Sequence, residues 1–211
     1  MAFPTYTTSE YWADAAVHVI GLVFVLIAGP ILIGSVAASG EANSIAAISI
    51  YVGSLLAMIA ASASYNLAPI GSLKQWLRRL DHSAIYIKIA GAYTPFAMLS
   101  LSGGSGYRLL IGVWIAAVSG VVVKLLWPRR FRLFTLSLYI MMGWAAAPIA
   151  GEVIENVQPE TWRLVLTSGC LYTTGVVFHL WERLPYQNVI WHCFVLVATA
   201  LMYAAMAVEF A

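Results

Sequence analysis

The feature that most constrains this chain is a series of long apolar stretches that carry almost no charge. Residues 15–40, 42–73, 133–151 and 184–208 contain no Asp, Glu, Lys or Arg. A helix needs about 20 apolar residues to cross the hydrocarbon core of a bilayer, and each stretch can supply them. The chain of 211 residues is 62% hydrophobic and 9% charged, which differs sharply from soluble domains. The sequence therefore predicts an integral membrane protein.

The length of these stretches indicates helices. A transmembrane β-barrel would show segments of about ten residues with alternating polarity, whereas the apolar stretches here are continuous. We expect an all-α membrane protein, a seven-transmembrane helix bundle that forms a single domain over residues 1–211. Pro, Gly and charged residues mark the expected helix ends. The helices are expected at residues 12–37, 43–67, 81–101, 107–126, 132–150, 161–180 and 188–210.

The distribution of cations predicts the orientation, because cytoplasmic loops carry an excess of Lys and Arg. With seven spans, the side of the N-terminus carries most of the cations, whereas the opposite side offers Arg108 and Arg163. The cations on the N-terminal side are Lys74, Arg78, Arg79, Lys124, Arg129, Arg130, Arg132 and Arg183. This pattern predicts a cytoplasmic N-terminus and an outer C-terminus. The net charge of +2 does not favour nucleic-acid binding, and membrane lipids are the expected partners.

Several polar side chains fall inside the expected spans, all toward the cytoplasmic side. Such residues are costly in a membrane, usually face the bundle interior and mark functional sites. Ser62 and Asn66 share one helix face, as do Asn188 and His192, because residues four apart stack on a helix. The full set is His18, Ser62, Asn66, Asp81, His82, Asn188 and His192. Their common depth favours one polar site, and hydrogen bonding between helices is the alternative interpretation for His18, Ser62 and Asn66.

Three ionisable residues belong to the third expected helix. Asp81 and His82 open it, about 100° apart around the axis, so we expect one of them to join the polar site. Asp81 taken alone also fits an N-cap, where a carboxylate is stabilised by free amides. Lys88 follows Asp81 by seven residues, on nearly the same face and about 10 Å deeper. We expect its long side chain to reach toward Asp81 rather than into lipid.

The sequence around this helix resembles a known family. Residues 78–86 read RRLDHSAIY and residues 89–96 read IAGAYTPF, which closely resembles the helix 3 signature of bacterial hemolysin III proteins, a branch of the progestin and adipoQ receptor superfamily. Further similar motifs lie in four other expected spans or at their ends. They are Ala13-Asp14 with His18 and Gly21, Ser62 with Tyr65, Arg130-Phe131-Arg132 with Met142-Gly143-Trp144, and Arg183-Leu184-Pro185-Tyr186 with residues 190–196.

The resemblance implies a cytoplasmic zinc site built from a Ser-x3-His pair, the helix 3 aspartate and a His-x3-His pair. Ser62, Asp81 and His192 match this pattern, but Asn66 and Asn188 stand at two histidine positions. Neutral amides are poor zinc ligands, so we expect a degraded metal site and no bound cofactor. Zinc bound by His192 and Asp81 with His18 or His82 is the alternative. If no metal is bound, Lys88 would neutralise the Asp81 carboxylate.

Three functions follow as expectations. The resemblance implies a lipid-responsive role in membrane homeostasis, in the inner membrane of a bacterium. The second is a zinc-dependent hydrolase of ceramide-like lipid amides, in which Asp81 and Ser62 act near a metal-bound water. The third is a lytic or pore-forming protein, as the family name suggests. The chain has no ring of like charges that would mark a conduction path, so the first two are favoured.

Overall fold

The computed structural model describes residues 6–101, 104–127 and 132–211, and its regular elements in these ranges are all helical. Arg129 and Arg130, two of the cations used to predict the orientation, lie outside the described residues. The elements are α1 (Thr8–Ala37), α2 (Ala42–Leu67), α3 (Ser72–Pro95), η1 (Phe96–Ser100), α4 (Gly104–Leu126), α5 (Arg132–Gly143), η2 (Ala147–Ile149), α6 (Ala150–Asn156), α7 (Pro159–Leu180) and α8 (Gln187–Phe210).

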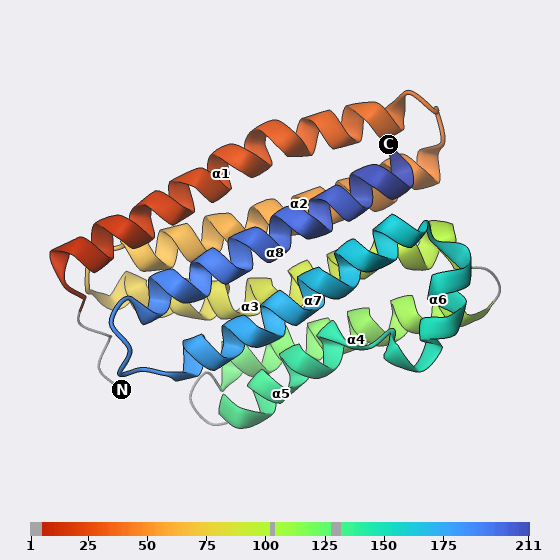
Figure 1. Cartoon of the computed structure of the whole chain (residues 1–211). Helices are drawn as coiled ribbons and strands as arrows, with labels where there is room; N and C mark the ends of the chain where they lie inside the picture. The colour runs from red at the N-terminus through yellow and green to blue at the C-terminus, as the bar shows by residue number, and fades with distance from the viewer. Residues whose placement is uncertain (1–5, 102–103, 128–131) are drawn as a thin grey trace.

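The long helices run side by side along one bundle axis (Figure 1). α1 packs on α2 and α8, α2 packs on α3, α3 packs on α4 and α5, and α7 packs on α8. One core of buried apolar side chains joins α1, α2 and α8, and a second joins α3 to α4 and α5. α1 begins and α8 ends at opposite ends of the bundle, as a chain with an odd number of crossings would.

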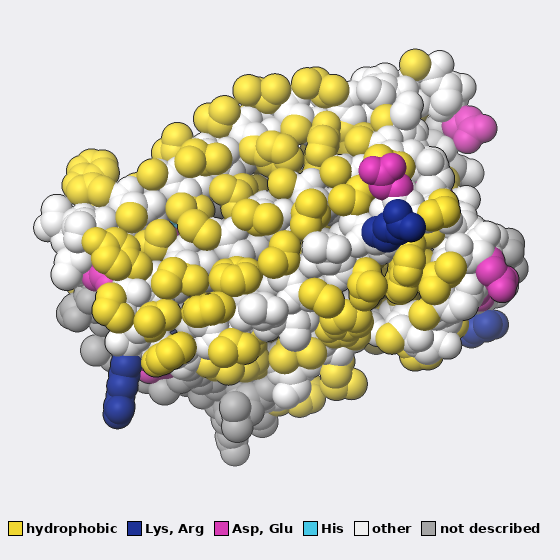
Figure 2. All heavy atoms as spheres, viewed as in Figure 1, with side chains coloured by type: hydrophobic (Ala, Val, Ile, Leu, Met, Phe, Trp, Pro, Cys, Tyr) yellow, Lys and Arg dark blue, Asp and Glu magenta, His cyan; other side chains and the backbone are white. Residues whose placement is uncertain are grey.

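The outer surface of the bundle is suited to lipid. Five segments are long and apolar enough to cross a membrane, namely Thr8–Ala37, Ala42–Leu67, Gly104–Leu126, Phe134–Asn156 and Gln187–Phe210. On α4 the exposed residues Ile111, Ile115, Val118 and Val122 recur at helical spacing on one outward face. Figure 2 shows a face covered by hydrophobic side chains, with few charges, mostly toward the two ends. The protein is therefore a multi-pass helical membrane protein.

α3 begins earlier than the sequence analysis predicted, at Ser72 rather than Asp81. The charged stretch that was taken for a loop forms the first turns of this helix because its cations bind neighbouring helix ends. The Lys74 ammonium donates to the carbonyls of Ala68 (2.8 Å) and Asn66 (3.4 Å) at the end of α2. Arg79 donates to the Leu125 carbonyl at the end of α4 (3.3 Å). Asp81 is therefore not an N-cap, and the capping interpretation is wrong.

The helix predicted at residues 132–150 is also not continuous. α5 ends at Gly143, a turn follows, and α6 begins at Ala150. Pro148, in the short helix η2 between them, lacks an N–H and cannot continue the α-helical hydrogen bonding. The Gly143 carbonyl instead accepts a hydrogen bond from the Tyr93 hydroxyl (2.8 Å). The break is thus compensated by a side chain of α3.

Candidate functional site

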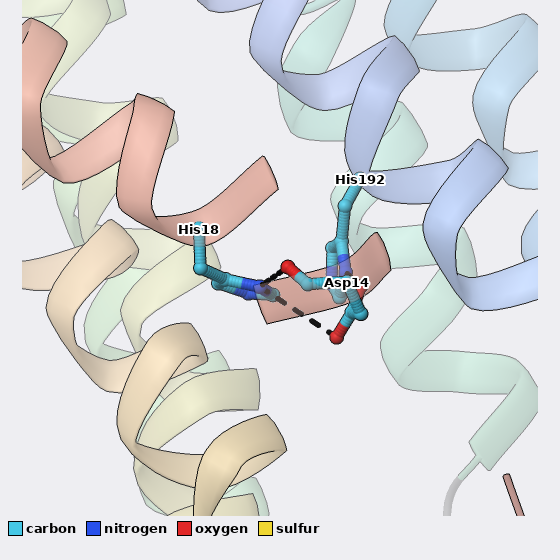
Figure 3. Close-up of side chains that lie close together, drawn as sticks. All are labelled: Asp14, His18 and His192. Carbon is cyan, nitrogen blue, oxygen red and sulfur yellow. Dashed lines mark hydrogen bonds and ion pairs between the residues drawn. The ribbon is translucent and has the colours of Figure 1, made fainter. Parts of the chain in front are cut away.

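Two helices bring an aspartate and two histidines together inside the bundle. Asp14 and His18 lie one turn apart on α1, and His192 faces them from α8 (Figure 3). The His192 Nδ1 atom is 2.6 Å from the Asp14 Oδ1 atom, and the two imidazole rings meet edge to face with centroids 4.5 Å apart. One ligand atom from each residue lies within 4.8 Å of the others. We call these three residues the Asp14 cluster.

The starts of α1 and α8 are tied to one another, which places the Asp14 cluster. Thr7 forms a capping box with Glu10, whose N–H donates to the Thr7 hydroxyl (3.2 Å). The Glu10 carboxylate also accepts a hydrogen bond from the backbone N–H of Tyr186 (2.8 Å). Tyr186 has a φ of 56° and immediately precedes α8. Glu10 therefore holds the first turns of both helices side by side, one turn before Asp14.

A backbone hydrogen bond fixes the His18 ring. Its Nδ1–H donates to the Asp14 carbonyl (2.8 Å), which leaves Nε2 as the acceptor, 3.1 Å from the Ser62 hydroxyl. Histidines that bind metals commonly donate their other ring N–H to a carbonyl or carboxylate in this way. His18 is 4% exposed. Its orientation is therefore set before any ligand binds.

The two asparagines form hydrogen bonds beside the Asp14 cluster. The Asn188 side-chain NH₂ donates to the side-chain Oδ1 of Asn66 (3.2 Å) and to Asp14 Oδ2 (3.4 Å). The Asn66 amide donates to the Ser62 backbone carbonyl (2.9 Å) and lies 3.3 Å from the Ser62 hydroxyl. The polar groups predicted on separate helices thus meet at one place. The spacing on each helix predicted the shared faces, and the common depth of these residues favoured one site.

Asp81 belongs to the same site. The Asp81 carboxylate is buried, interacts with the Ser62 hydroxyl and lies within electrostatic reach of His192 and Asp14. His82 is half-buried and lines the cavity described below. Its backbone carbonyl accepts a hydrogen bond from Tyr139 (2.7 Å).

The sequence predicts that Lys88 reaches toward Asp81. The structure shows instead that Lys88 binds another residue. Its ammonium donates to the Tyr172 hydroxyl of α7 and lies 3.8 Å from the centroid of the same ring. The carboxylate of Asp81 has His192 and Ser62 beside it instead. Lys88 therefore does not neutralise Asp81, because an aromatic partner on a third helix holds the ammonium elsewhere.

A large cavity connects these groups. Its volume is about 1620 Å³, larger than the range of about 300–1,000 Å³ that is common for small-molecule sites. The wall includes the Asp14 cluster, Ser62, Asp81 and Lys88, together with many apolar side chains such as Ile59, Phe96, Val195 and Leu196. A polar group at one end and an apolar wall beyond it suit an amphiphilic molecule.

The donor chemistry decides which residues suit a metal ion. Asn188 directs its NH₂ group at Asp14 and Asn66, and the Asn66 oxygen accepts from Asn188. These two amides are therefore engaged with one another and do not fit as ligands. The Asp14 cluster offers one carboxylate and two imidazoles, which are zinc donors, and catalytic zinc sites commonly have three protein ligands. The residues at the family's histidine positions do not fit zinc, but this neighbouring set does.

Asp14 is the site residue that the sequence analysis did not select. It belongs to a motif of the resemblance, near the start of the first helix. The signal that identifies it is its spacing, because it precedes His18 by four residues in an otherwise apolar helix. Residues with this spacing share a face. The alternative zinc site predicted from the sequence has Asp81 as its carboxylate ligand, whereas in the structure the carboxylate beside His18 and His192 is that of Asp14.

The fold and the site together define a helical membrane protein with an internal polar site and a lipid-sized cavity. Residues 7–203 match the model of the family described as haemolysin-III related. The chain is 35% identical over 199 residues to hemolysin-3 of Bacillus cereus, covering 94% of this chain and 91% of the relative. The chain therefore belongs to the hemolysin III family.

Two other relatives extend the comparison. The hemolysin-3 homolog of Bacillus subtilis is 34% identical over 198 residues, which cover 94% of this chain and 93% of the relative. The human monocyte to macrophage differentiation factor is 26% identical over 144 residues, which cover 68% of this chain and 59% of the relative. The match to this animal protein supports the wider progestin and adipoQ receptor superfamily. None of the solved structures matches the chain.

Proposed function

We propose that this protein binds a membrane lipid inside the bundle, beside a divalent metal ion held by Asp14, His18 and His192, and responds to the lipid state of the bilayer. The observation that carries the proposal is the Asp14 cluster in the wall of a cavity of about 1620 Å³. Zinc fits the donor set best, since imidazole and carboxylate are its ordinary ligands. When bound, zinc would polarise a lipid carbonyl or acidify a bound water.

The residues around the cluster would act on the lipid head. Asn188 already donates to Asp14, so it would hold that carboxylate in place when a lipid enters. The Ser62 hydroxyl lies between His18 and Asp81, which take its single proton, so its oxygen would accept a hydrogen bond from a polar group of the lipid. The apolar wall beyond these groups would exclude water from the acyl chain.

Hydrolysis of a lipid amide is the second candidate function. It is favoured by the position of the Asp81 carboxylate, which interacts with Ser62 and lies within electrostatic reach of His192. In this candidate, Asp81 would accept a proton from a water molecule at the site, as a general base must do from within hydrogen-bond reach. Ceramide-like amides are the substrates to test first.

The proposal includes the topology. Seven crossings, with a cytoplasmic N-terminus in the inner membrane of a bacterium, are supported by the opposite ends at which α1 begins and α8 ends. They are also supported by the cations Lys74, Arg78, Arg79, Lys124 and Arg183, which lie near the N-terminal side. α3 and α7 are also long enough to cross a membrane. The charges of α3 lie mostly in its first turns.

Lipid extraction and an amide hydrolysis assay together test the proposal. Protein purified in a mild detergent should carry bound lipid that mass spectrometry detects, and less of it when Ser62 and His192 are both replaced by Ala. Turnover of a fluorescent ceramide that disappears in Asp81→Asn would establish the hydrolase. Bound lipid without turnover in zinc-loaded protein would exclude the hydrolase and support the lipid-responsive role. The absence of bound lipid would contradict both functions.

A further inference from the structure

A second polar cluster lies deeper in the cavity. The Lys88 ammonium on α3 donates to the Tyr172 hydroxyl on α7, which lies 2.7 Å from the Thr199 hydroxyl on α8. Lys88 is 4% exposed and Thr199 is 1% exposed, yet all three residues line the cavity. We call Lys88, Tyr172 and Thr199 the Lys88 cluster.

The two clusters are separated along the cavity by the same helical offset on two helices. Thr199 follows His192 of the Asp14 cluster by seven residues on α8, and Lys88 follows Asp81, which lies near that cluster, by seven residues on α3. Seven residues correspond to about 10 Å along a helix axis. The Lys88 cluster is therefore a separate layer, about two turns from the Asp14 cluster, and the Asp14 cluster cannot serve as its counter-charge at contact distance.

The charge of Lys88 is not matched by the protein. Among the described residues, no carboxylate lies within 4.0 Å of its ammonium, and its contacts are the hydroxyl and the ring face of Tyr172. An ammonium has three N–H donors, and cation–π contact offsets only part of the cost of burial. A buried charge without a partner is strongly unfavourable. An anionic group bound in the cavity beside Lys88 would balance this charge.

The wall around the Lys88 cluster indicates the rest of the ligand. Ala92 lies one turn beyond Lys88 on α3, and Met202 lies one turn beyond Thr199 on α8. Both line the cavity, as does Phe96. A ligand with one anionic group and a long alkyl chain would place its charge on Lys88 and its chain along these apolar side chains.

We propose that Lys88, Tyr172 and Thr199 form a subsite for the carboxylate of a single-chain amphiphile. This inference rests on the proposed function, because it assumes that the cavity accepts lipid. A carboxylate is favoured over a phosphate monoester, which carries close to two negative charges, because one ammonium with neutral hydroxyl partners balances one negative charge. Lys88 binds the carboxylate, and Tyr172 holds the ammonium in position through its hydroxyl and ring.

Paired probes of equal chain length test the subsite. Binding of dodecanoate and of dodecanol is measured with the full-length protein in nanodiscs, with the signal of empty nanodiscs subtracted. Treatment with a chelator removes any competing carboxylate site at the Asp14 cluster. A charge-assisted hydrogen bond is worth about 1.5–3 kcal/mol, so the acid should bind about tenfold or more tightly than the alcohol.

Variants of Lys88 decide the origin of this preference. Lys88→Met should reduce the acid-to-alcohol preference to about one, and Lys88→Arg should retain most of it. Tyr172→Phe should weaken the preference without abolishing it, and it provides a second variant if Lys88→Met does not fold. A full preference in Lys88→Met would overturn the subsite. Equal binding of both probes by the wild type would overturn the subsite alone, whereas binding of neither would overturn the lipid cavity as well.

Discussion

At the residue scale, the site depends on side chains whose spacing could be read from the sequence and on contacts that could not. The pairs Ser62 with Asn66 and Asn188 with His192 were predictable because residues four apart share a helix face. The partner of Lys88 was not predictable, because Tyr172 lies 84 residues away on another helix. Helical periodicity fixes faces within a helix, but the rotation of one helix against another is set by packing.

Asp14 is the residue whose replacement separates metal binding from simple hydrogen bonding. Asp14→Asn keeps the shape but removes the charge that faces His192 and Asn188. A ligand that binds only the folded state stabilises it by about 2.7 kcal/mol at a concentration of 100 times Kd. We expect zinc to raise the Tm of the wild type and to leave the Tm of Asp14→Asn unchanged.

The control for this prediction is Glu155→Gln, which removes an exposed carboxylate on α6. This variant should keep the full response of the wild type to zinc. Thermal unfolding with and without zinc measures both variants. A full zinc response in Asp14→Asn would show that the aspartate is not a ligand.

At the element scale, the all-helical architecture and its long apolar segments follow from the sequence, whereas the exact ends of α3 and α5 do not. Considered without the neighbouring helices, the charges of Lys74 and Arg79 indicate a loop. Both cations instead donate to free carbonyls at the ends of α2 and α4. Every helix end has such carbonyls, but these come within reach of α3 only once the helices pack together. Local sequence rules therefore placed the start of α3 too late.

Lys74 links the end of α2 to the site, because it donates to the carbonyls of Ala68 and Asn66. Hydrogen bonds from charged groups contribute about 1.5–3 kcal/mol each. Lys74→Met should therefore lower the free energy of unfolding by about 2 kcal/mol. Arg183→Met, which removes an exposed cation before α8, serves as the control. Equal stability of the two variants in denaturant titrations would contradict the role of Lys74.

Close packing of α3 on α4 depends on Gly120. A Cβ atom there would lie 2.6 Å from the Tyr86 ring, whose hydroxyl donates to the Thr135 carbonyl of α5 (3.0 Å). Overpacking of this kind costs about 1–3 kcal/mol, and Gly120→Ala should lower the Tm accordingly. Gly112→Ala on the same helix meets no atom within 4 Å and should not. A similar Tm for both variants would show that the contact is not tight.

At the scale of the whole molecule, the cations near the α1 start predict which end of the bundle faces the cytoplasm. A C-terminal alkaline phosphatase fusion should be active in a bacterial host, because this enzyme needs the disulfides that form outside the cytoplasm. A fusion after Leu126, at the end of α4, should be inactive. The reverse pattern would overturn the orientation, and activity of both fusions would contradict the number of crossings.

The metal content of the purified protein tests the central claim, which is that Asp14, His18 and His192 form a metal site where the family's histidine positions hold asparagines. Protein purified without chelator is analysed by mass spectrometry of its elements, alongside His18→Ala and His192→Ala. The account predicts about one zinc ion per wild-type chain and a strong loss in both variants. A wild type without zinc or another divalent metal, or variants that retain it, would contradict the account.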